Sequence, residues 1–259
     1  MKTNKELRMI GRENLRGNYL TAVSNLILVG VFGLILQSIL GKVLGISTID
    51  ITADITANDL SDPYGVKQFI VTLITSFVSA LLTLGLTWGF LDIQDGEKLT
   101  VGHLFKPFKE GMGKSIAFSL FKQFLLVLWS LLLIVPGIIK SYSWAMAEFI
   151  YYDNRDLAIK DILAESSYIM KGSRWRLFKM DFFYSILYFV PILLWLVFFL
   201  VTLASQGDNA SYVAAFALLG ILVVVIVLTT VLAFIIEPRR LSARAAFYVD
   251  LVGKSNDIV

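Results

Sequence analysis

The chain contains no cysteine and a single histidine, His103. The absence of cysteine excludes disulfide bonds, thiolate catalysis and cysteine-ligated metals. One histidine leaves little from which to assemble an acid–base or metal site. No P-loop, dinucleotide-binding glycine motif or His-Glu-x-x-His motif occurs. We therefore expect no catalytic residue, no cofactor and no metal, and we predict that the protein is not an enzyme.

Apolar sequence, in contrast, is abundant. Hydrophobic residues form 57% of the 259 residues and the mean hydropathy is +0.74, whereas an ordinary soluble domain is about 45–50% apolar. About 20 apolar residues cover a hydrocarbon core of roughly 30 Å. We predict an all-α membrane helix bundle, a single integral membrane domain over residues 1–259. Its six transmembrane helices pair as three hairpins, at residues 19–44, 68–91, 115–135, 138–152, 182–204 and 212–236.

The basic residues are confined to one set of connecting segments. Segments 1–18, 92–114, 153–181 and 237–259 contain 19 of the 23 Lys and Arg residues, and the connectors 47–66 and 205–211 contain none. Short loops that keep Lys and Arg face the cytoplasm. Both termini are thus predicted to be cytoplasmic. We expect the basic segments to contact anionic headgroups of membrane lipids rather than nucleic acid.

Hydropathy alone does not decide whether segment 115–152 crosses the membrane once or twice. As one crossing it would send the six basic residues of 153–181 outside, against the charge rule. A hairpin broken at Pro136-Gly137 restores an even number of crossings, because proline removes a backbone donor and glycine permits a tight turn. Residues 138–152 are short for a full span.

An amphipathic segment that ends near a glycine precedes each hairpin: 3–16, 101–109 and 156–171. In the third, Ile162, Ser166 and Met170 share one apolar arc. Asp156 is the predicted N-cap and Gly172 the residue after the end. We expect this helix to lie against the membrane surface or the inner face of the bundle. Ser166 is interpreted as a small packing residue, and His103 as a solvated side chain in a short loop.

Lys122 is the most unusual residue, because it lies roughly 10 Å inside the third span. Charges at such depth tend to face a bundle interior and to be paired. Glu148 is the nearest partner in depth, and Asp181 and Glu237 lie near the same surface. These four residues form the candidate polar intramembrane site. The alternative is that Lys122 snorkels to the cytoplasmic headgroups.

Small polar residues form a stripe on the second span, with Gly85-x-x-x-Gly89 beside it: Thr72, Ser76, Ser79, Thr83 and Thr87. Such stripes tighten helix packing in membranes. They could also line a polar path, but packing is the favoured interpretation.

Several motifs resemble one bacterial integral-membrane family, catalogued as domain of unknown function 975. The segments that carry the resemblance are Arg12-x-x-Leu15-x-Gly17-Asn18-Tyr19, Pro136-Gly137-Ile138-Ile139-Lys140, Ser166-x-x-x-Met170-Lys171-Gly172 and Pro238 with Ala246-Phe247-Tyr248. The resemblance implies a multi-pass protein of the bacterial plasma membrane with no established activity. A more distant likeness is to the membrane domain attached to some glycerophosphodiester phosphodiesterases, whose hydrolytic domain has no counterpart here.

Two functions from different classes remain. The preferred hypothesis is a non-enzymatic membrane scaffold or accessory subunit that binds lipids and a protein partner or a second copy of itself. The alternative is a small transporter or exporter with a polar path near Lys122 and Glu148. A polar cavity that reaches the midplane would favour transport, and a solid bundle would favour the scaffold.

Overall fold

The computed structural model describes residues 1–46, 63–204 and 211–256, and the described residues form helices and no β-strand. The all-α expectation is confirmed. In chain order the elements are α1 (Asn4–Asn14), α2 (Tyr19–Val43), α3 (Pro63–Asp92), the 3-10 helices η1 (Ile93–Asp95) and η2 (Val101–Phe105), α4 (Lys106–Lys109), α5 (Met112–Leu132), α6 (Ile134–Ser143), α7 (Ala147–Asp153), α8 (Ile159–Ile169), α9 (Arg174–Ala204) and α10 (Ser211–Asn256).

Five helices in the described part of the chain, α2, α3, α5, α9 and α10, are long and apolar enough to cross a membrane. They indicate a multi-pass membrane protein. The predicted span at 138–152 instead consists of α6 and α7, two short helices separated by a turn at residues 144–146. Neither is long enough to cross by itself, so a sixth span is not shown.

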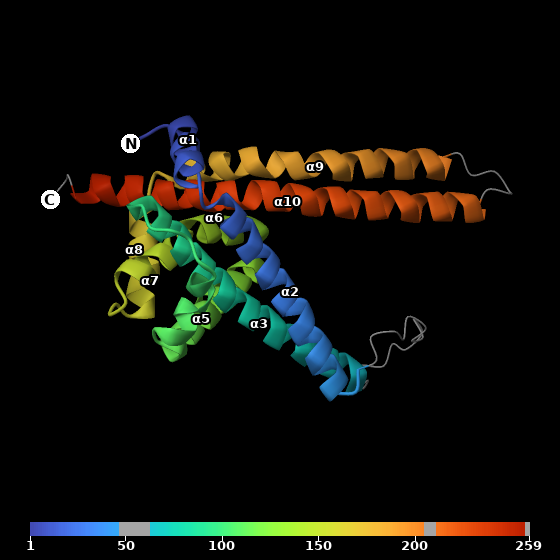
Figure 1. Ribbon diagram of the computed structural model, residues 1–259, viewed down its shortest axis with the longest axis horizontal. Helices are drawn as coiled ribbons and strands as arrows, with labels where there is room; N and C mark the ends of the chain where they lie inside the picture. Colours follow the sequence, from blue (N-terminus) through green and yellow to red (C-terminus); the bar gives the residue numbers. More distant parts are fainter. Residues whose placement is uncertain (47–62, 205–210, 257–259) are drawn as a thin grey trace.

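The long helices are arranged in pairs that diverge from one end of the molecule. Figure 1 shows α2 beside α3 and α9 beside α10, and α5 packs on α6 as a third pair. We call these pairs the arms. The end where they meet also contains α1, η1, η2, α4, α7 and α8, and we call it the base. Both termini lie there (Figure 1). The connectors at 47–66 and 205–211 fall largely outside the described residues.

The turn of the second arm differs from the expectation. The chain breaks at Leu133, which has an extended backbone with φ −162° and ψ 142°, and not at Pro136-Gly137. Pro136 lies in the first turn of α6, where its missing N–H has no intrahelical acceptor to lose. A Cβ on Gly137 would come within 2.7 Å of Ser130 Oγ. The Pro-Gly pair therefore starts the return helix and lets it pack closely on α5.

Glycines follow the three amphipathic segments as predicted, although Gly172 lies two residues after the C-cap Met170 of α8 and not directly after it. Gly17, Gly111 and Gly172 have φ values of 82°, 104° and 83°, a region that L side chains rarely adopt. Each glycine therefore redirects the chain at the foot of an arm. In the first segment, Thr3 and Glu6 form a capping box that starts α1.

Helix α8 confirms the predicted apolar face and corrects its start. Ile162, Ser166 and Met170 are all 0% exposed, and Lys160 is exposed. The N-cap is Ala158 and not Asp156. The helix packs on α5, α6, α7 and α10, so its apolar face lies against the inner face of the bundle.

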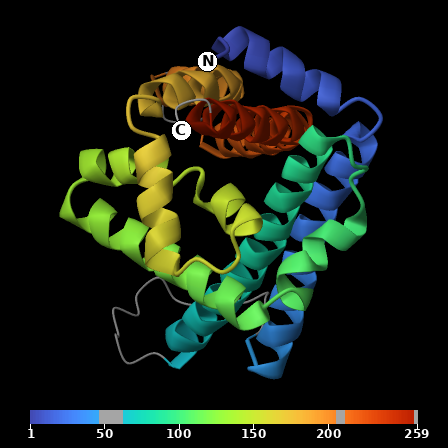
Figure 2. The same cartoon turned by 90° about the vertical axis from the view of Figure 1, so that its left-hand side faces the viewer.

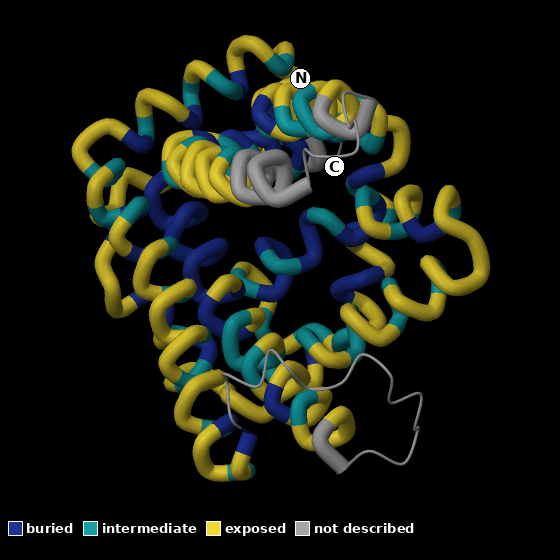
Figure 3. Tube along the Cα trace, turned by 90° about the vertical axis from the view of Figure 1, so that its right-hand side faces the viewer, coloured by how far each residue is buried: buried dark blue, intermediate teal, exposed yellow. Residues whose placement is uncertain are grey.

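Burial is concentrated in the base. The hydrophobic core is built from α1, α7, α8 and the adjoining ends of the long helices, and most large apolar side chains of the arms are exposed (Figure 3). Helix α1 lies across the base ends of α9 and α10 (Figure 2). A Cβ on Gly11 would come within 2.8 Å of the Ala243 nitrogen, so this crossing requires glycine. The Oγ of Ser242 donates to the Gly11 carbonyl at 2.8 Å.

Candidate functional site

Lys122 and Glu148 form an ion pair where the second arm joins the base. Lys122 projects from the middle of α5, and Glu148 lies in the first turn of α7. The turn at Leu133 returns the chain towards the base, which brings the two helices together. Lys122 Nζ donates to Glu148 Oε1 at 2.8 Å, and the Lys122 side chain is 15% exposed. The predicted pairing is present, and the Lys122 ammonium group is bound within the protein.

The other two predicted members have partners of their own. Asp181, on α9, accepts two hydrogen bonds from Arg244 on α10, Nε to Oδ1 at 3.0 Å and Nη2 to Oδ2 at 2.5 Å. Glu237 pairs with Arg240 at 2.7 Å and accepts from the Tyr188 hydroxyl at 3.1 Å. The four carboxylate and ammonium groups therefore do not form one cluster.

Arg244 connects two of these pairs. A cavity of about 210 Å³ is lined by Lys122, Leu126, Ser141, Tyr142, Ala145, Glu148 and Arg244. Asp181 is thus adjacent to the Lys122–Glu148 pair through the guanidinium group that binds it. Sequence reasoning missed Arg244. The available signal was one arginine within Ser242-Ala243-Arg244-Ala245-Ala246, whose small neighbours allow a basic side chain to reach between helices.

A larger groove between α3 and α5 reaches the same ion pair. Its volume is about 920 Å³. Nine of its lining residues are large apolar or aromatic side chains, and the polar ones are Ser76, Ser119, Gln123, Lys122 and Glu148.

Most residues of the predicted polar stripe on α3 do not line this groove. Thr83 and Thr87 donate to carbonyls of their own helix, and Ser79 faces Gly33 of α2. Ser79 therefore supports packing against α2, Thr83 and Thr87 are bonded within α3, and Ser76 alone of these four lines the groove.

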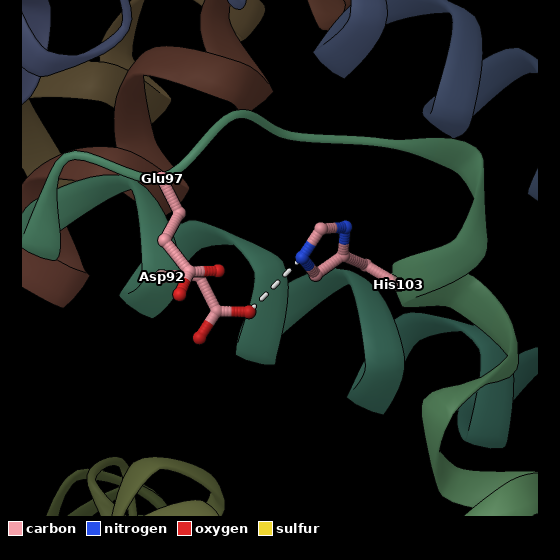
Figure 4. Close-up of side chains that lie close together, drawn as sticks. All are labelled: Asp92, Glu97 and His103. Carbon is pink, nitrogen blue, oxygen red and sulfur yellow. Dashed lines mark ion pairs between the residues drawn. The ribbon is translucent and has the colours of Figure 1, made fainter.

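His103 contradicts its expectation. It is 6% exposed and its Nε2 lies 3.0 Å from Asp92 Oδ2 (Figure 4). His103 Nδ1 faces Thr100, whose backbone nitrogen lies 3.0 Å away and whose carbonyl oxygen lies 3.1 Å away, and Nε2 donates towards the Asp92 carboxylate, which only accepts. The reason is the close approach of η2 to α3. A Cβ on Gly85 would meet the Leu104 carbonyl oxygen at 2.7 Å, and one on Gly89 would meet His103 Cβ at 3.0 Å.

Asp92, Glu97 and His103 place their ligand atoms within 4.8 Å of one another (Figure 4), a separation compatible with a metal ion. The donors around Asp92 argue against one. Lys106 Nζ donates to Asp92 Oδ2 at 2.6 Å, and the Tyr152 hydroxyl donates to Oδ1 at 2.7 Å. A cation would have to displace the Lys106 ammonium group and the His103 proton.

The Asp92 cluster is therefore a hydrogen-bonded tie between elements of the base. Lys106 also donates to the Tyr152 hydroxyl at 2.8 Å, so the cluster joins the end of α3 to η2, α4 and α7. Burial lowers the pKa of Lys106, but the hydrogen bonds to Asp92 and Tyr152 outweigh it and raise the pKa above the usual 10.5. Lys106 is accordingly held as a cation and is not a proton acceptor at neutral pH.

Ser166 is a packing residue, as expected. It is fully buried and its Oγ donates to the Ser143 carbonyl at 2.9 Å. Its hydroxyl and the His103 ring are thus engaged in separate hydrogen bonds, and they do not form a nucleophile–base pair.

The other motif residues shape the backbone or the packing of the base. Lys140 Nζ lies 4.8 Å from the Trp129 ring centre and 5.5 Å from that of Trp144, which is a cation–π arrangement. Met170 is fully buried, and Lys171 is exposed beside the glycine that ends α8.

Comparison with known proteins gives one match. The family described as "Protein of unknown function (DUF975)" matches residues 1–143, from the N-terminus to the end of α6. The match includes Pro136, Gly137 and Lys140, and it ends before the segment around Ser166, Met170, Lys171 and Gly172. No curated protein and no solved structure matches the chain.

Proposed function

This chain belongs to the DUF975 family of proteins of unknown function, and from that premise we propose that it is a non-enzymatic scaffold or accessory subunit of the bacterial plasma membrane. In this proposal the base lies at the cytoplasmic face, where it binds anionic lipid headgroups and a protein partner or a second copy of the chain. The arms cross the bilayer six times in three hairpins, with α6 as the additional crossing, which reaches the base where α7 begins, and with both termini inside.

Charge supports the orientation. Lys5, Arg12 and Arg16 of the N-terminal segment are exposed on the base, as are Lys160 and Lys171 at α8. Basic residues beside a membrane are each attracted to anionic lipid by about 1 kcal/mol near the surface. Exposed acidic residues such as Glu13 and Asp161 lie beside them, but the four basic segments hold 19 Lys and Arg against 14 Asp and Glu, and this excess supports a base that rests on cytoplasmic headgroups.

The observation that carries the scaffold proposal is that the buried charges of the base are paired with one another. Asp181 is bound by Arg244, Asp92 by His103, Lys106 and Tyr152. Buried polar networks of this kind fix the positions of helices. An acid–base catalyst needs a group that is free to exchange a proton with a substrate, and the paired groups are poor candidates for that role.

The transporter alternative has one observation in its favour, the groove that reaches Lys122 and Glu148. Its lining is mostly apolar, however, and a path for ions or polar solutes needs polar groups along its length. The apolar lining supports the scaffold with bound lipid better than it supports conduction.

A distance measurement separates the two functions. The chain has no cysteine of its own, so spin labels can be attached at Leu34→Cys on α2 and Leu194→Cys on α9, both exposed. In proteoliposomes the scaffold predicts one distance population between these arms, unchanged by an imposed ion gradient. Leu34→Cys with Ile70→Cys, within one arm, is the control and should be constant in either case. Two inter-arm populations that exchange with the gradient would favour the transporter.

Topology is tested by labelling intact cells with an impermeant thiol reagent. Ser61→Cys, in a connector assigned outside, should react. Lys160→Cys, on the exposed face of α8, should react only after the cells are opened. The reverse pattern would show that the base faces the exterior and would contradict the proposed orientation.

A further inference from the structure

The groove between α3 and α5 has the dimensions of a ligand site. Its volume of about 920 Å³ is at the upper end of the range of roughly 300–1,000 Å³ for small-molecule sites. Along α3 it extends from Phe69 to Leu84, about 22 Å at the rise of an α-helix. One leaflet of the hydrocarbon core is about 15 Å thick. A lipid acyl chain can therefore lie in the groove along its whole length.

The position of the groove indicates that its ligand comes from the bilayer. Both helices that form it are apolar enough to span a membrane. The side chains at its rim, Phe69, Leu73 and Phe124, are 66%, 53% and 65% exposed. Because these side chains face hydrocarbon when the helices are inserted, the groove opens towards lipid and not towards water. A membrane lipid can enter it without crossing an aqueous phase.

A polar compartment adjoins the inner end of the groove. The cavity of about 210 Å³ that Arg244 and Tyr142 line shares Lys122, Leu126 and Glu148 with the groove. A large apolar compartment thus meets a small polar one at a single ion pair. This arrangement matches a molecule with an apolar chain and a compact polar head.

The polar compartment has hydrogen-bond donors left over after its two ion pairs are formed, and these donors suit an anionic head. Glu148 takes one of the three donors of Lys122, and Asp181 takes two of the five donors of Arg244. The remaining donors can bind phosphate oxygens, for which both side chains are suited.

We propose that this groove binds one phospholipid of the surrounding bilayer. An acyl chain lies between α3 and α5, and the phosphate binds Lys122 and Arg244. The inference rests on the membrane insertion of the arms in the proposed function and is independent of the scaffold role.

Photo-crosslinking tests this site. The full-length protein is reconstituted in vesicles that contain either phosphatidylglycerol with a diazirine on its acyl chain or a diacylglycerol with the same chain and no phosphate. Cross-linked peptides are identified by mass spectrometry. In the unmodified protein we expect cross-links concentrated on α3 and α5. The phosphatidylglycerol probe should exceed the diacylglycerol by about tenfold, the difference expected for charged hydrogen bonds to one phosphate.

Two variants and a matched control assign the result to the groove. Ala80→Trp fills the groove and should lower cross-linking of both probes. Lys122→Met should reduce the phosphatidylglycerol signal to the diacylglycerol level, and Lys122→Arg should restore it. Leu194→Trp, on the exposed surface of α9, should change neither. Thermal unfolding of each variant shows whether a loss of cross-linking is caused by misfolding. If a variant is misfolded, the proposal is judged by the comparison of the two probes in the unmodified protein.

Cross-links spread evenly over the arms, as for lipid that merely surrounds the protein, would overturn the proposal. So would equal yields of the two probes in the unmodified protein. These results differ from those that would overturn the scaffold, because exchange between two inter-arm distances contradicts the scaffold even when a lipid occupies the groove.

Discussion

Helix α10 is one continuous helix with two different environments. Between residues 219 and 235, all within the described part of the chain, no residue is buried. Between 242 and 251, seven of the ten residues are buried, among them Phe247 at 0% exposed. The buried proline Pro238 lies near the boundary. The outer half therefore belongs to an arm and the inner half to the core of the base.

This difference shows where the specificity of the fold resides. Apolar side chains of an arm lose little when they exchange a protein neighbour for a lipid chain, because both are hydrocarbon. In the base, shape and hydrogen bonding determine which helix packs on which. We therefore expect substitutions of similar chemistry to have large effects in the base and small ones in the arms.

The largest effect is expected at Arg244. In Arg244→Met the Asp181 carboxylate, 3% exposed, loses both of its guanidinium hydrogen bonds, and an unpaired buried charge costs about 3–5 kcal/mol. The apparent melting temperature in nanodiscs should fall sharply, and Arg244→Met with Asp181→Leu should recover much of the loss. If Arg244→Met alone leaves the melting temperature unchanged, the ion pair does not hold α9 to α10.

A cavity in the base should be almost as costly. Ile162→Ala removes three carbons from a fully buried position on α8, and such substitutions cost about 2–5 kcal/mol. Val223→Ala, at a 59% exposed position of α10, serves as the arm control, and Lys160→Ala on the exposed face of α8 should be within about 0.5 kcal/mol of the unmodified protein. Denaturant titration followed by tryptophan fluorescence measures all three. Equal losses at Ile162 and Val223 would contradict the comparison between base and arm.

Glycines provide a third contrast. A Cβ on Gly85 would meet the backbone oxygens of His103 and Leu104, whereas one on Gly30 of α2 would meet nothing within 4 Å. Gly85→Ala should cost about 1–3 kcal/mol because backbone cannot move aside. Gly30→Ala should be neutral or stabilising by up to about 1 kcal/mol. The melting temperature should fall for Gly85→Ala and should stay the same or rise for Gly30→Ala. If Gly85→Ala is as stable as the unmodified protein, η2 can move away from α3 to make room for the Cβ.

Much of the fold follows from local sequence. Hydropathy located the five spans that became α2, α3, α5 and the outer parts of α9 and α10, because a run of about 20 apolar residues is typical of a membrane-spanning helix. The chain reversals near Gly17, Gly111 and Gly172 were expected from the amphipathic pattern before each glycine, and the positive φ of these residues accompanies them. The inner halves of α9 and α10 were not predicted, because segments rich in Arg and Lys look like loops. In the fold, Arg176 pairs with Asp250 at 2.8 Å, a long-range contact between the inner parts of the two helices that local sequence does not reveal.

The part of the candidate site that could be predicted is the part set by how deep a residue lies in its span and by which spans form a hairpin. Lys122 and Glu148 lie at similar distances from one end of a hairpin, so their pairing could be expected. The Asp92 cluster depends on how closely η2 approaches α3. The Gly85-x-x-x-Gly89 pair was visible in the sequence, but that motif usually brings two helices together. Here it admits a 3-10 segment, and with it His103, which no local pattern distinguishes from a solvated residue.

A smaller effect than at Arg244, and the sharpest test of the boundary between base and arms, is expected at the Lys122–Glu148 pair. The Glu148 side chain is 33% exposed and that of Lys122 15%, so the pair lies between the dry base and the groove. Lys122→Met and Glu148→Gln should each lower the melting temperature. The double variant should lower stability by less than the sum of the single changes, with a coupling energy of about 0.5–3 kcal/mol.

The control is the same double-mutant cycle at Arg155 and Glu110, an ion pair on the outer surface of the base whose side chains are 31% and 43% exposed. Its coupling energy should be at most about 1 kcal/mol. Strict additivity at Lys122 and Glu148 would mean that water or lipid headgroups already screen the pair, and the boundary of the base would then lie further from the groove.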